Sequence, residues 1–173
     1  NVLGTATLLE AGRKVGIRRF VHVSTDEVYG ALLPEEPAFT EDSPLRPRNP
    51  YSASKAGADQ LVLAYHHTFG LPAVVTRSGN NYGPYQFPEK LIPLMIANVL
   101  EGKAIPVYGD GLQVRDWIHV DDHCAAIDAV LEKGKAGAVY NIGASSELPN
   151  LTLVHTVLKL MGRGDELIRF VED

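Results

Sequence analysis

The sequence has almost no cysteine and no long hydrophobic run. Cys124 is the single cysteine among 173 residues, so neither an intrachain disulfide nor a cysteine-rich zinc site can form. We interpret it as a small apolar residue of a helix. No stretch reaches the ~18 consecutive apolar residues of a membrane span, and no charged-then-apolar leader opens the chain. These absences make the cytoplasm the expected location.

Runs of one charge are also missing. The formal net charge of −5 arises from 16 basic and 21 acidic residues that are interspersed along the chain. Nucleic acids and anionic membranes attract clustered basic residues, so we expect neither as a partner. Among the histidines, His66 and His67 are neighbours that point apart on a helix, and His119 and His123 lack a second matched cluster. We therefore expect no bound metal.

The sequence does contain an alternation of helical segments and short apolar runs. Its hydrophobic content of 45% suffices for the core of one compact domain, or one and a part. Asn49 and Pro50 form a typical helix start, with a capping side chain before a first-turn proline. The pattern predicts, in order, a helix at 3–15, a strand at 20–23, a loop at 29–50, a helix at 51–69, a strand at 72–77, a turn at 80–84, a helix at 91–100, extended segments at 105–108 and 114–120, a helix capped by Asp122 up to 133, a strand at 138–142 and a helix at 151–161.

This alternation predicts an α/β fold. Short, fully apolar strands separated by helices indicate a Rossmann-like, doubly wound parallel sheet with helices on both faces. The chain opens on a helix, and no Gly-x-x-Gly-x-x-Gly loop joins a strand to a helix. We therefore expect that the N-terminal half of the sheet is absent. Residues 1–82 and 117–149 are expected to form the rest of the dinucleotide-binding domain, and residues 83–116 and 150–173 a small, incomplete substrate lobe.

The first candidate for chemistry is the pair Tyr51 and Lys55. One helical turn separates them, so both lie on one face of the helix. A nearby ammonium favours the phenolate and lowers the pKa of a tyrosine toward a value useful for a general base. Taken alone, the pair is better explained as a partly exposed aromatic residue beside a solvated lysine, because such pairs arise by chance on many helices.

The context of this pair favours catalysis. The strand about thirty residues earlier ends in Ser24-Thr25, at the carboxyl edge where open α/β sheets place ligands. A hydroxyl group there can reach a substrate hydroxyl or the carbonyl made from it. A serine or threonine, a tyrosine and a lysine on successive elements resemble the triad of the short-chain dehydrogenase/reductases.

The carboxylates of Asp26 and Glu27 come directly after the same strand. In isolation they could be a solvated acidic turn. The run Thr25-Asp26-Glu27-Val28-Tyr29-Gly30, however, resembles the dTDP-glucose 4,6-dehydratases within the extended branch of that family, the NAD-dependent epimerases and dehydratases.

A third group of residues has the chemistry of a nucleotide-diphosphate site. Asparagine amides offer donors to phosphate oxygens, an arginine offers a planar charged fork, and an exposed tyrosine can stack on a base. Each residue alone is better explained as part of a turn or a structural contact. The stretches concerned are Asn80 to Pro84, Phe87 to Pro93, Pro106 to Gly109 and Arg115 to Trp117.

Together these stretches are similar to the substrate lobe of the same dehydratases, and the resemblance runs from Asn1 to the Asn150 region. It implies a cofactor, NAD, and a substrate, a nucleotide-diphosphate sugar. The implied catalytic residues are Thr25, Asp26, Glu27, Tyr51 and Lys55. The implied cofactor contacts are Tyr51, Lys55 and Asn81. The implied substrate contacts are Thr25, Asn80, Lys90, Leu91, Pro106, Tyr108, Arg115 and Asn150.

The resemblance also implies a reaction. Tyr51 would take the proton of the sugar C4 hydroxyl while hydride leaves C4 for NAD. Glu27 would then remove the C5 proton while Asp26 protonates the departing C6 hydroxyl, and hydride would return to C6. A nucleotide-sugar 4-epimerase, which does not need the acidic pair, and a catalytically silent binding or scaffold module remain as alternatives.

The resemblance has two further implications. The family pairs the helices at 1–15 and 51–69 with those of a second subunit, so a homodimer is expected. Because the chain lacks the glycine-rich phosphate loop, we expect it to be inactive and to bind NAD poorly on its own. Neither the nucleotide base nor the sugar can be identified from these residues.

Overall fold

The computed structural model describes residues 1–32 and 36–172, and the chain divides into two compact units. Unit 1 consists of Asn1–Gly79 and Asp121–Ile142, and unit 2 of Asn80–Val120 and Gly143–Asp173. The sequence predicted a similar division, with boundaries near residues 82, 117 and 149, whereas the two units divide after Gly79, Val120 and Ile142. Their roles in cofactor and substrate binding stay a prediction.

A three-stranded parallel sheet forms the centre of unit 1. It contains β1 (Phe20–Thr25), β2 (Ala73–Ser78) and β6 (Val139–Ile142) in the order β1-β2-β6. The middle strand, β2, is buried at every position, as a parallel strand covered on both faces must be. The predicted α/β fold with a parallel sheet is thus confirmed.

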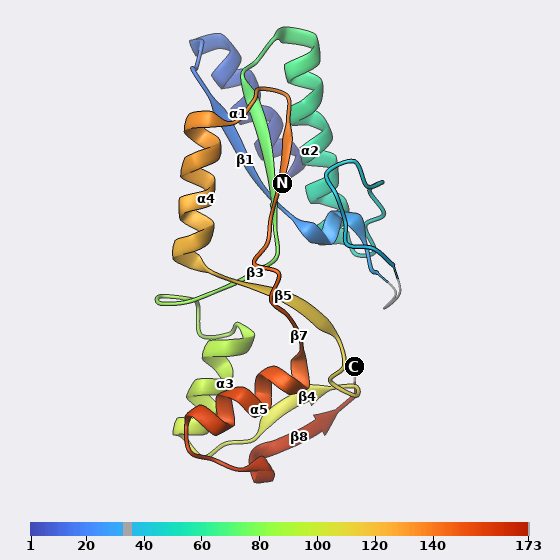
Figure 1. Cartoon of the computed structure of the whole chain (residues 1–173). Helices are drawn as coiled ribbons and strands as arrows, with labels where there is room; N and C mark the ends of the chain where they lie inside the picture. The colour runs from blue at the N-terminus through green and yellow to red at the C-terminus, as the bar shows by residue number, and fades with distance from the viewer. Residues whose placement is uncertain (33–35, 173) are drawn as a thin grey trace. The chain divides into compact units, whose positions relative to one another are not determined.

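Helices cover both faces of this sheet (Figure 1). The helices α1 (Val2–Val15) and α2 (Pro50–Phe69) contact each other, and α2 packs on β1 and β2. The helix α4 (Val120–Lys133) lies on the opposite side in Figure 1. Apolar side chains from α1, α2 and β2 make the shared core, which contains Leu9, Val62, Leu71, Ala73 and Val75.

The start of α2 has the geometry expected from sequence. Asn49 Oδ1 accepts a hydrogen bond from Ser52 N at 2.8 Å, and Ser52 Oγ accepts one from Asn49 N at 3.3 Å. Pro50 occupies the first turn, where its missing N–H leaves no unsatisfied donor. This reciprocal capping fixes the start of α2 and therefore the position of Tyr51 in its first turn.

Unit 2 has its own apolar core between two helices and a small sheet. The helices α3 (Leu91–Leu100) and α5 (Asn150–Leu160) pack together over β4 (Ile105–Tyr108), which pairs in parallel with β8 (Ile168–Val171). A second sheet has the order β3 (Asn80–Tyr82), β5 (Val114–His119), β7 (Glu147–Pro149). A 3-10 turn, η2 (Asp165–Leu167), precedes β8.

Four local predictions are corrected by the structure. The helix α4 begins at Val120, so Asp122 lies in its first turn and is not its cap. The predicted turn at 80–84 begins with strand β3, and β7 and β8 were not foreseen. These strands have three or four residues and pair with segments far along the chain. Such short segments have no periodicity that distinguishes them from loops.

No helix among the described residues is long and apolar enough to cross a bilayer. The longest helix, α2, has 20 residues, and its polar side chains include Lys55, Asp59 and Gln60.

Candidate functional site

The acidic pair lies in a 3-10 turn, η1 (Asp26–Tyr29), which directly follows β1. Thr25, at the end of β1, caps this turn: its Oγ1 accepts a hydrogen bond from Glu27 N at 3.2 Å. The same hydroxyl lies 3.3 Å from Asp26 Oδ1, to which it donates. The structure therefore brings together three of the predicted catalytic residues at the carboxyl end of a parallel strand.

Asn49 connects this turn to the start of α2. Its Nδ2 donates to Glu27 Oε2 at 3.2 Å, while its Oδ1 caps the helix through Ser52 N. Asn49 was predicted as a cap only, because sequence cannot show that its free amide would meet a carboxylate 22 positions earlier. It thereby couples Glu27 to the helix that carries Tyr51.

Tyr51 and Lys55 lie one turn apart on α2, as predicted. Tyr51 is 50% exposed, and Lys55 Nζ donates to the carbonyl oxygen of Val23 at 2.8 Å. This bond attaches α2 to β1 one strand residue before Ser24. Tyr51 and Lys55 thus border the same strand end as Thr25.

The prediction that the pKa of Tyr51 is lowered is wrong for this chain. Partial burial, followed by the charges of Glu27 and Asp26, raises the pKa of the Tyr51 phenol above its usual value of 10.0. Both causes disfavour the phenolate, since burial penalises charge and like charges repel. Lys55 is directed to the Val23 carbonyl. The phenolate of Tyr51 is therefore less favoured than its spacing from Lys55 predicts.

A buried polar network lies behind η1. Tyr29, 2% exposed, donates from its hydroxyl to Asn141 Oδ1 at 2.7 Å and accepts from Arg77 Nη1 at 2.8 Å. Arg77 also donates from Nε to Asp59 Oδ2 at 2.9 Å. None of these four residues was predicted as functional. The sequence signal that could have revealed them is the pair of opposite charges Arg77 and Asp59, which lie on the apolar strand β2 and on the buried face of α2.

In unit 2, the turn between β4 and β5 gathers three predicted substrate residues. Tyr108 ends β4 and is 55% exposed, and Arg115 is exposed on β5. Asn150 N donates to Gln113 O at 3.0 Å, which places the start of α5 beside β5. The ladder pairs Arg115 with Leu148, so Asn150 lies diagonally across from the arginine.

The glycine of this turn is required by its geometry. Gly111 has φ of 72°, and a Cβ atom there would lie 2.7 Å from Val107 Cγ1. Asn150 Oδ1 is buried without a hydrogen-bond partner among the described residues.

The other predicted substrate and cofactor residues of unit 2 lie on separate elements. Asn80 and Asn81 are on β3, paired with β5. Lys90 precedes α3 as an exposed side chain whose Nζ lies 3.8 Å from Glu89 Oε1. Leu91 packs against the unit 2 core, and Pro106 is half-buried in β4.

Asp116 organises the connection that leads to β7. Its Oδ1 accepts from Ser146 N at 2.8 Å and its Oδ2 from Ala144 N at 2.9 Å. It was missed because a carboxylate one position after Arg115 is indistinguishable by sequence from a surface charge. Its two bonds hold the antiparallel partner of the strand that carries Arg115.

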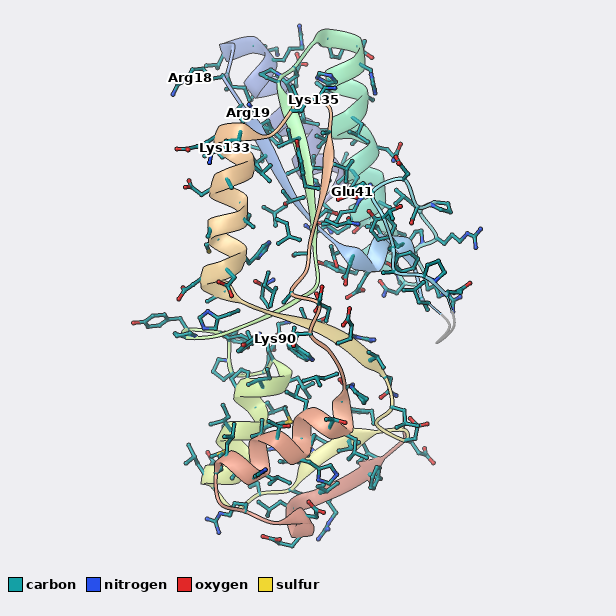
Figure 2. The ribbon with its side chains drawn as sticks, in the orientation of Figure 1. Arg18, Arg19, Glu41, Lys90, Lys133 and Lys135 are labelled. Carbon is teal, nitrogen blue, oxygen red and sulfur yellow. The ribbon has the colours of Figure 1, made fainter. Side chains whose placement is uncertain are left out.

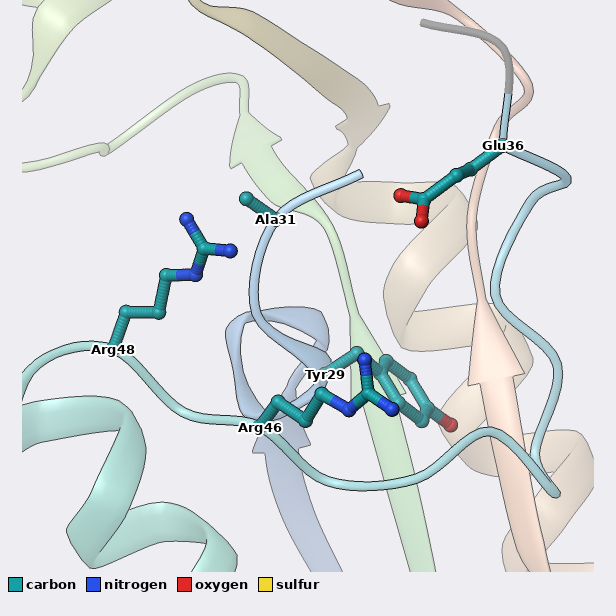
Figure 3. Close-up of a pocket in the computed structure, with 5 residues that line it drawn as sticks. All are labelled: Tyr29, Ala31, Glu36, Arg46 and Arg48. Carbon is teal, nitrogen blue, oxygen red and sulfur yellow. The ribbon is translucent and has the colours of Figure 1, made fainter. Parts of the chain in front are cut away.

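A separate pocket lies on unit 1, outside the predicted catalytic group (Figure 3). It is lined by Tyr29, Ala31, Glu36, Arg46 and Arg48. Within residues 1–32 and 36–172, no group of three or more metal-ligating side chains converges.

Comparison with known proteins relates the chain to sugar-nucleotide enzymes. It is 54% identical over 173 residues to dTDP-glucose 4,6-dehydratase of Streptomyces niveus, covering 100% of this chain and 51% of that protein. It also matches the structure of a Bacillus anthracis dTDP-glucose 4,6-dehydratase in complex with NAD, with 56% identity and a TM-score of 0.96 over 99% of this chain and 55% of that one. The chain thus spans about half the length of the curated relatives it matches.

A related enzyme of different activity has the same fold. UDP-glucuronic acid 4-epimerase of Bacillus cereus, in complex with UDP-glucuronic acid and NAD, is 32% identical, with a TM-score of 0.92 over 99% of this chain and 54% of that one. The fold alone therefore does not separate a dehydratase from an epimerase. The model of the NAD dependent epimerase/dehydratase family matches residues 1–143. The chain belongs to this family.

Proposed function

We propose that this protein converts dTDP-glucose to dTDP-4-keto-6-deoxyglucose with NAD as cofactor. The observation that carries the proposal is the acidic pair Asp26 and Glu27 in η1, which follows β1 directly and is linked to the start of α2 by the bond from Asn49 to Glu27. A simple oxidation or epimerisation at C4 needs a base for the C4 hydroxyl only. An elimination across C5 and C6 also needs one group to remove a proton and another to donate one.

The residues present fit a bound nicotinamide cofactor. Tyr51 is half exposed beside the carboxyl end of a parallel strand, where α/β sheets bind such ligands. NAD, when bound, would accept hydride from C4 and supply it to C6. The residues that we propose hold it are Tyr51, Lys55 and Asn81. A cationic ring near Tyr51 would also counter the raised pKa of the phenol.

Tyr51 would act first. As a phenolate it removes the proton of the C4 hydroxyl, which leaves C4 as a ketone once hydride has departed. Thr25, whose single hydroxyl hydrogen is donated to Asp26 Oδ1, would lie beside the oxygen at C4 and hold Asp26 in place. Lys55, held by the Val23 carbonyl, would keep positive charge beside the helix.

The acidic pair would then eliminate water. The C4 ketone acidifies the C5 proton, which Glu27 removes, and the electron pair of that C–H bond forms the C5–C6 double bond. Asp26 gives its proton to the leaving C6 hydroxyl, so one water departs and the charge balances. Asn49 donates to Glu27 Oε2 and Thr25 donates to Asp26 Oδ1, so the two carboxyl groups have different partners. Different surroundings are what allow neighbouring carboxyls to divide acid and base roles.

Unit 2 would bind the nucleotide diphosphate. Arg115 offers a charged fork to phosphate oxygens, Asn150 an amide oxygen that can accept from an N–H or hydroxyl of the nucleotide, and Tyr108 an exposed ring for stacking on the base. The remaining proposed contacts of this unit are Asn80, Lys90, Leu91 and Pro106.

The deciding experiment is product analysis. The full-length protein is incubated with NAD and dTDP-glucose, and the sugar is examined by mass spectrometry and NMR. Loss of one water with a C4 carbonyl and a C6 methyl group supports the proposal. Retention of the C6 oxygen with an inverted C4 indicates an epimerase, and binding without turnover indicates a silent binding module.

We also propose that the protein is a homodimer through α1 and α2. The outer face of α1 exposes Leu3 at 84% and Leu8 at 61%, more apolar surface than a solvent-facing helix needs. Leu8→Glu should halve the mass measured by light scattering, whereas Leu100→Glu, at a 73% exposed position of unit 2, should not. A cytoplasmic location would fit a nucleotide-activated substrate and a single free thiol.

The activity of this chain alone is a separate proposal. Since the sequence contains no glycine-rich phosphate loop, we expect it to bind NAD poorly by itself. Calorimetric titration of the chain with NAD tests this, and submicromolar binding would contradict it.

A further inference from the structure

We propose that Tyr29 is a positioning residue for the elimination step, held by Arg77 and Asn141, and that it aims the carboxylates of Asp26 and Glu27. This inference rests on the proposed dehydration. It assigns a role to a buried network that no step of that mechanism uses.

The anchor itself is fully buried. Tyr29 is 2% exposed and Arg77 3% exposed, and the hydroxyl of Tyr29 has a donor on one side and an acceptor on the other. The guanidinium carbon of Arg77 also lies 4.8 Å from the centre of the Tyr29 ring. Arg77 and Asn141 face each other in the register of β2 and β6. Tyr29 is thereby attached to the two strands that do not carry η1.

Each partner of Tyr29 is itself held in place. Arg77 Nε donates to Asp59 Oδ2, and Asp59 is 0% exposed on α2. Asn141 N donates to Glu41 Oε1 at 2.9 Å. Glu41, labelled in Figure 2, lies in the loop before α2. The network thus joins α2, β2, β6 and the loop before α2.

The acidic turn also has anchors of other kinds. It is a 3-10 turn of four residues, and such turns are held weakly by their own hydrogen bonds. Val28 is fully buried, and its carbonyl oxygen accepts a hydrogen bond from Arg46 N at 3.0 Å. Gly30, with φ of 99°, passes so close to Arg46 that a Cβ atom would lie 2.6 Å from the Arg46 oxygen. Tyr29 adds the side-chain hydrogen bonds that attach η1 to β2 and β6.

Tyr51 also has anchors that do not involve Tyr29. Its helix start is fixed by the Asn49–Ser52 capping box, and α2 is attached to β1 through Lys55. Asn49 donates to Glu27, and Ala56 of α2 packs in one cluster with Val28 and Tyr29. Removal of the Tyr29 hydroxyl alone keeps this packing, so it should displace the carboxylates more than the phenol. This difference distinguishes a positioning role from a general loss of stability.

The first arm of the test measures anchoring without activity. Tyr29→Phe keeps the ring stacked on Phe39 and removes only the hydroxyl. Thr76→Val is the matched control: it removes another fully buried hydroxyl of unit 1, one that donates to His22 O and does not touch η1. Hydrogen–deuterium exchange should accelerate in the segment 26–30 of Tyr29→Phe only. Equal exchange of that segment in both variants and wild type would overturn the anchoring.

The second arm measures the two chemical steps in the full-length protein with NAD and dTDP-glucose. We expect Tyr29→Phe to slow loss of the C5 proton about tenfold, less than the roughly 100-fold that a 1 Å misplacement costs, with reduction of NAD changed by less than about twofold. Thr76→Val should leave the ratio of the two rates unchanged. Equal slowing of both steps in Tyr29→Phe would overturn the positioning role.

A second variant protects the test from a folding defect. Asn141→Ala removes the acceptor of the Tyr29 hydroxyl but keeps the backbone bond to Glu41, so it should alter the same ratio in the same direction. An unchanged ratio in a folded Asn141→Ala protein counts against the proposal. If the wild-type protein forms no 4-keto-6-deoxy sugar, the proposed function fails, and the exchange arm still decides whether Tyr29 anchors η1.

Discussion

Unit 1 and unit 2 stabilise their interiors in different ways. The buried polar residues among those described belong to unit 1: Thr5, His22, Ser24, Thr25, Ser52, Asp59, Thr76, Arg77, Ser78 and His123. The buried core of unit 2 is a cluster of apolar side chains, namely Met95, Val99, Ile105, Val107, Trp117, Leu153, Val154, Val157 and Leu158.

This difference matches the tasks proposed for the two units. A buried polar network is satisfied in few arrangements, so it specifies the position of the turn attached to it. Apolar packing is tolerant of small shifts, which suffices for a lobe whose binding groups project from its surface. Catalytic carboxylates need placement within about 0.5 Å, whereas surface contacts to a flexible diphosphate can adapt.

The strongest test of the comparison is to remove the chemistry of unit 1 while preserving its shape. In the full-length protein, Glu27→Gln and Asp26→Asn should slow dehydration by about 10²–10⁴-fold, because an amide can replace neither the base nor the acid. Tyr51→Phe should instead impair oxidation at C4. Single-turnover absorbance of reduced NAD, together with solvent deuterium at C5, separates these steps. Near wild-type product formation by both amide variants would show that the pair is a solvated turn.

A stability experiment contrasts the two interiors directly. Asp59→Ala leaves the Arg77 charge buried and unpaired, which should cost about 3–5 kcal/mol of unfolding free energy. Met95→Leu, a volume-conserving exchange in the unit 2 core, should cost less than about 1.5 kcal/mol. Denaturant unfolding followed by circular dichroism compares them. Equal losses would mean that the polar network confers no special sensitivity.

A binding experiment examines the surface groups of unit 2. Arg115→Ala should weaken binding of the nucleotide sugar by about 2 kcal/mol through loss of a charge-assisted contact, with the fold retained. Arg169→Ala is a suitable control, because Arg169 is also an exposed arginine of unit 2 that donates to a carbonyl beside it in sequence. Calorimetry with full-length protein measures both, and an unchanged affinity in Arg115→Ala would reduce this residue to a structural contact.

The smallest expected effect is a shift in pH dependence. Because burial, Glu27 and Asp26 raise the pKa of Tyr51, the phenolate fraction, and with it the rate of C4 oxidation, should increase as the pH rises toward that pKa. Glu27→Gln removes one negative charge, so the profile should move to lower pH. Rapid-mixing measurements of NAD reduction between neutral and alkaline pH reveal the shift. A profile that does not move would show that Glu27 has no electrostatic effect on the phenol.

Elements with strong local signals could be predicted from the sequence. Fully apolar runs predicted β1, β2 and β6, and the Asn49-Pro50 start predicted the position of α2, because burial on both faces and helix capping depend on adjacent residues. The order of Thr25, the acidic pair and the Tyr51–Lys55 pair also predicted which groups meet at one strand end, since parallel strands end at the same edge of a sheet.

Contacts between distant segments could not be predicted and became apparent in the folded chain. The raised pKa of Tyr51 arises from carboxylates 24 and 25 positions earlier, and the bond between Tyr29 and Asn141 spans 112 positions. The short strands β3, β7 and β8 likewise exist through their partners. Local patterns contain no information on which distant side chains converge, because that depends on how the sheet and its helices pack.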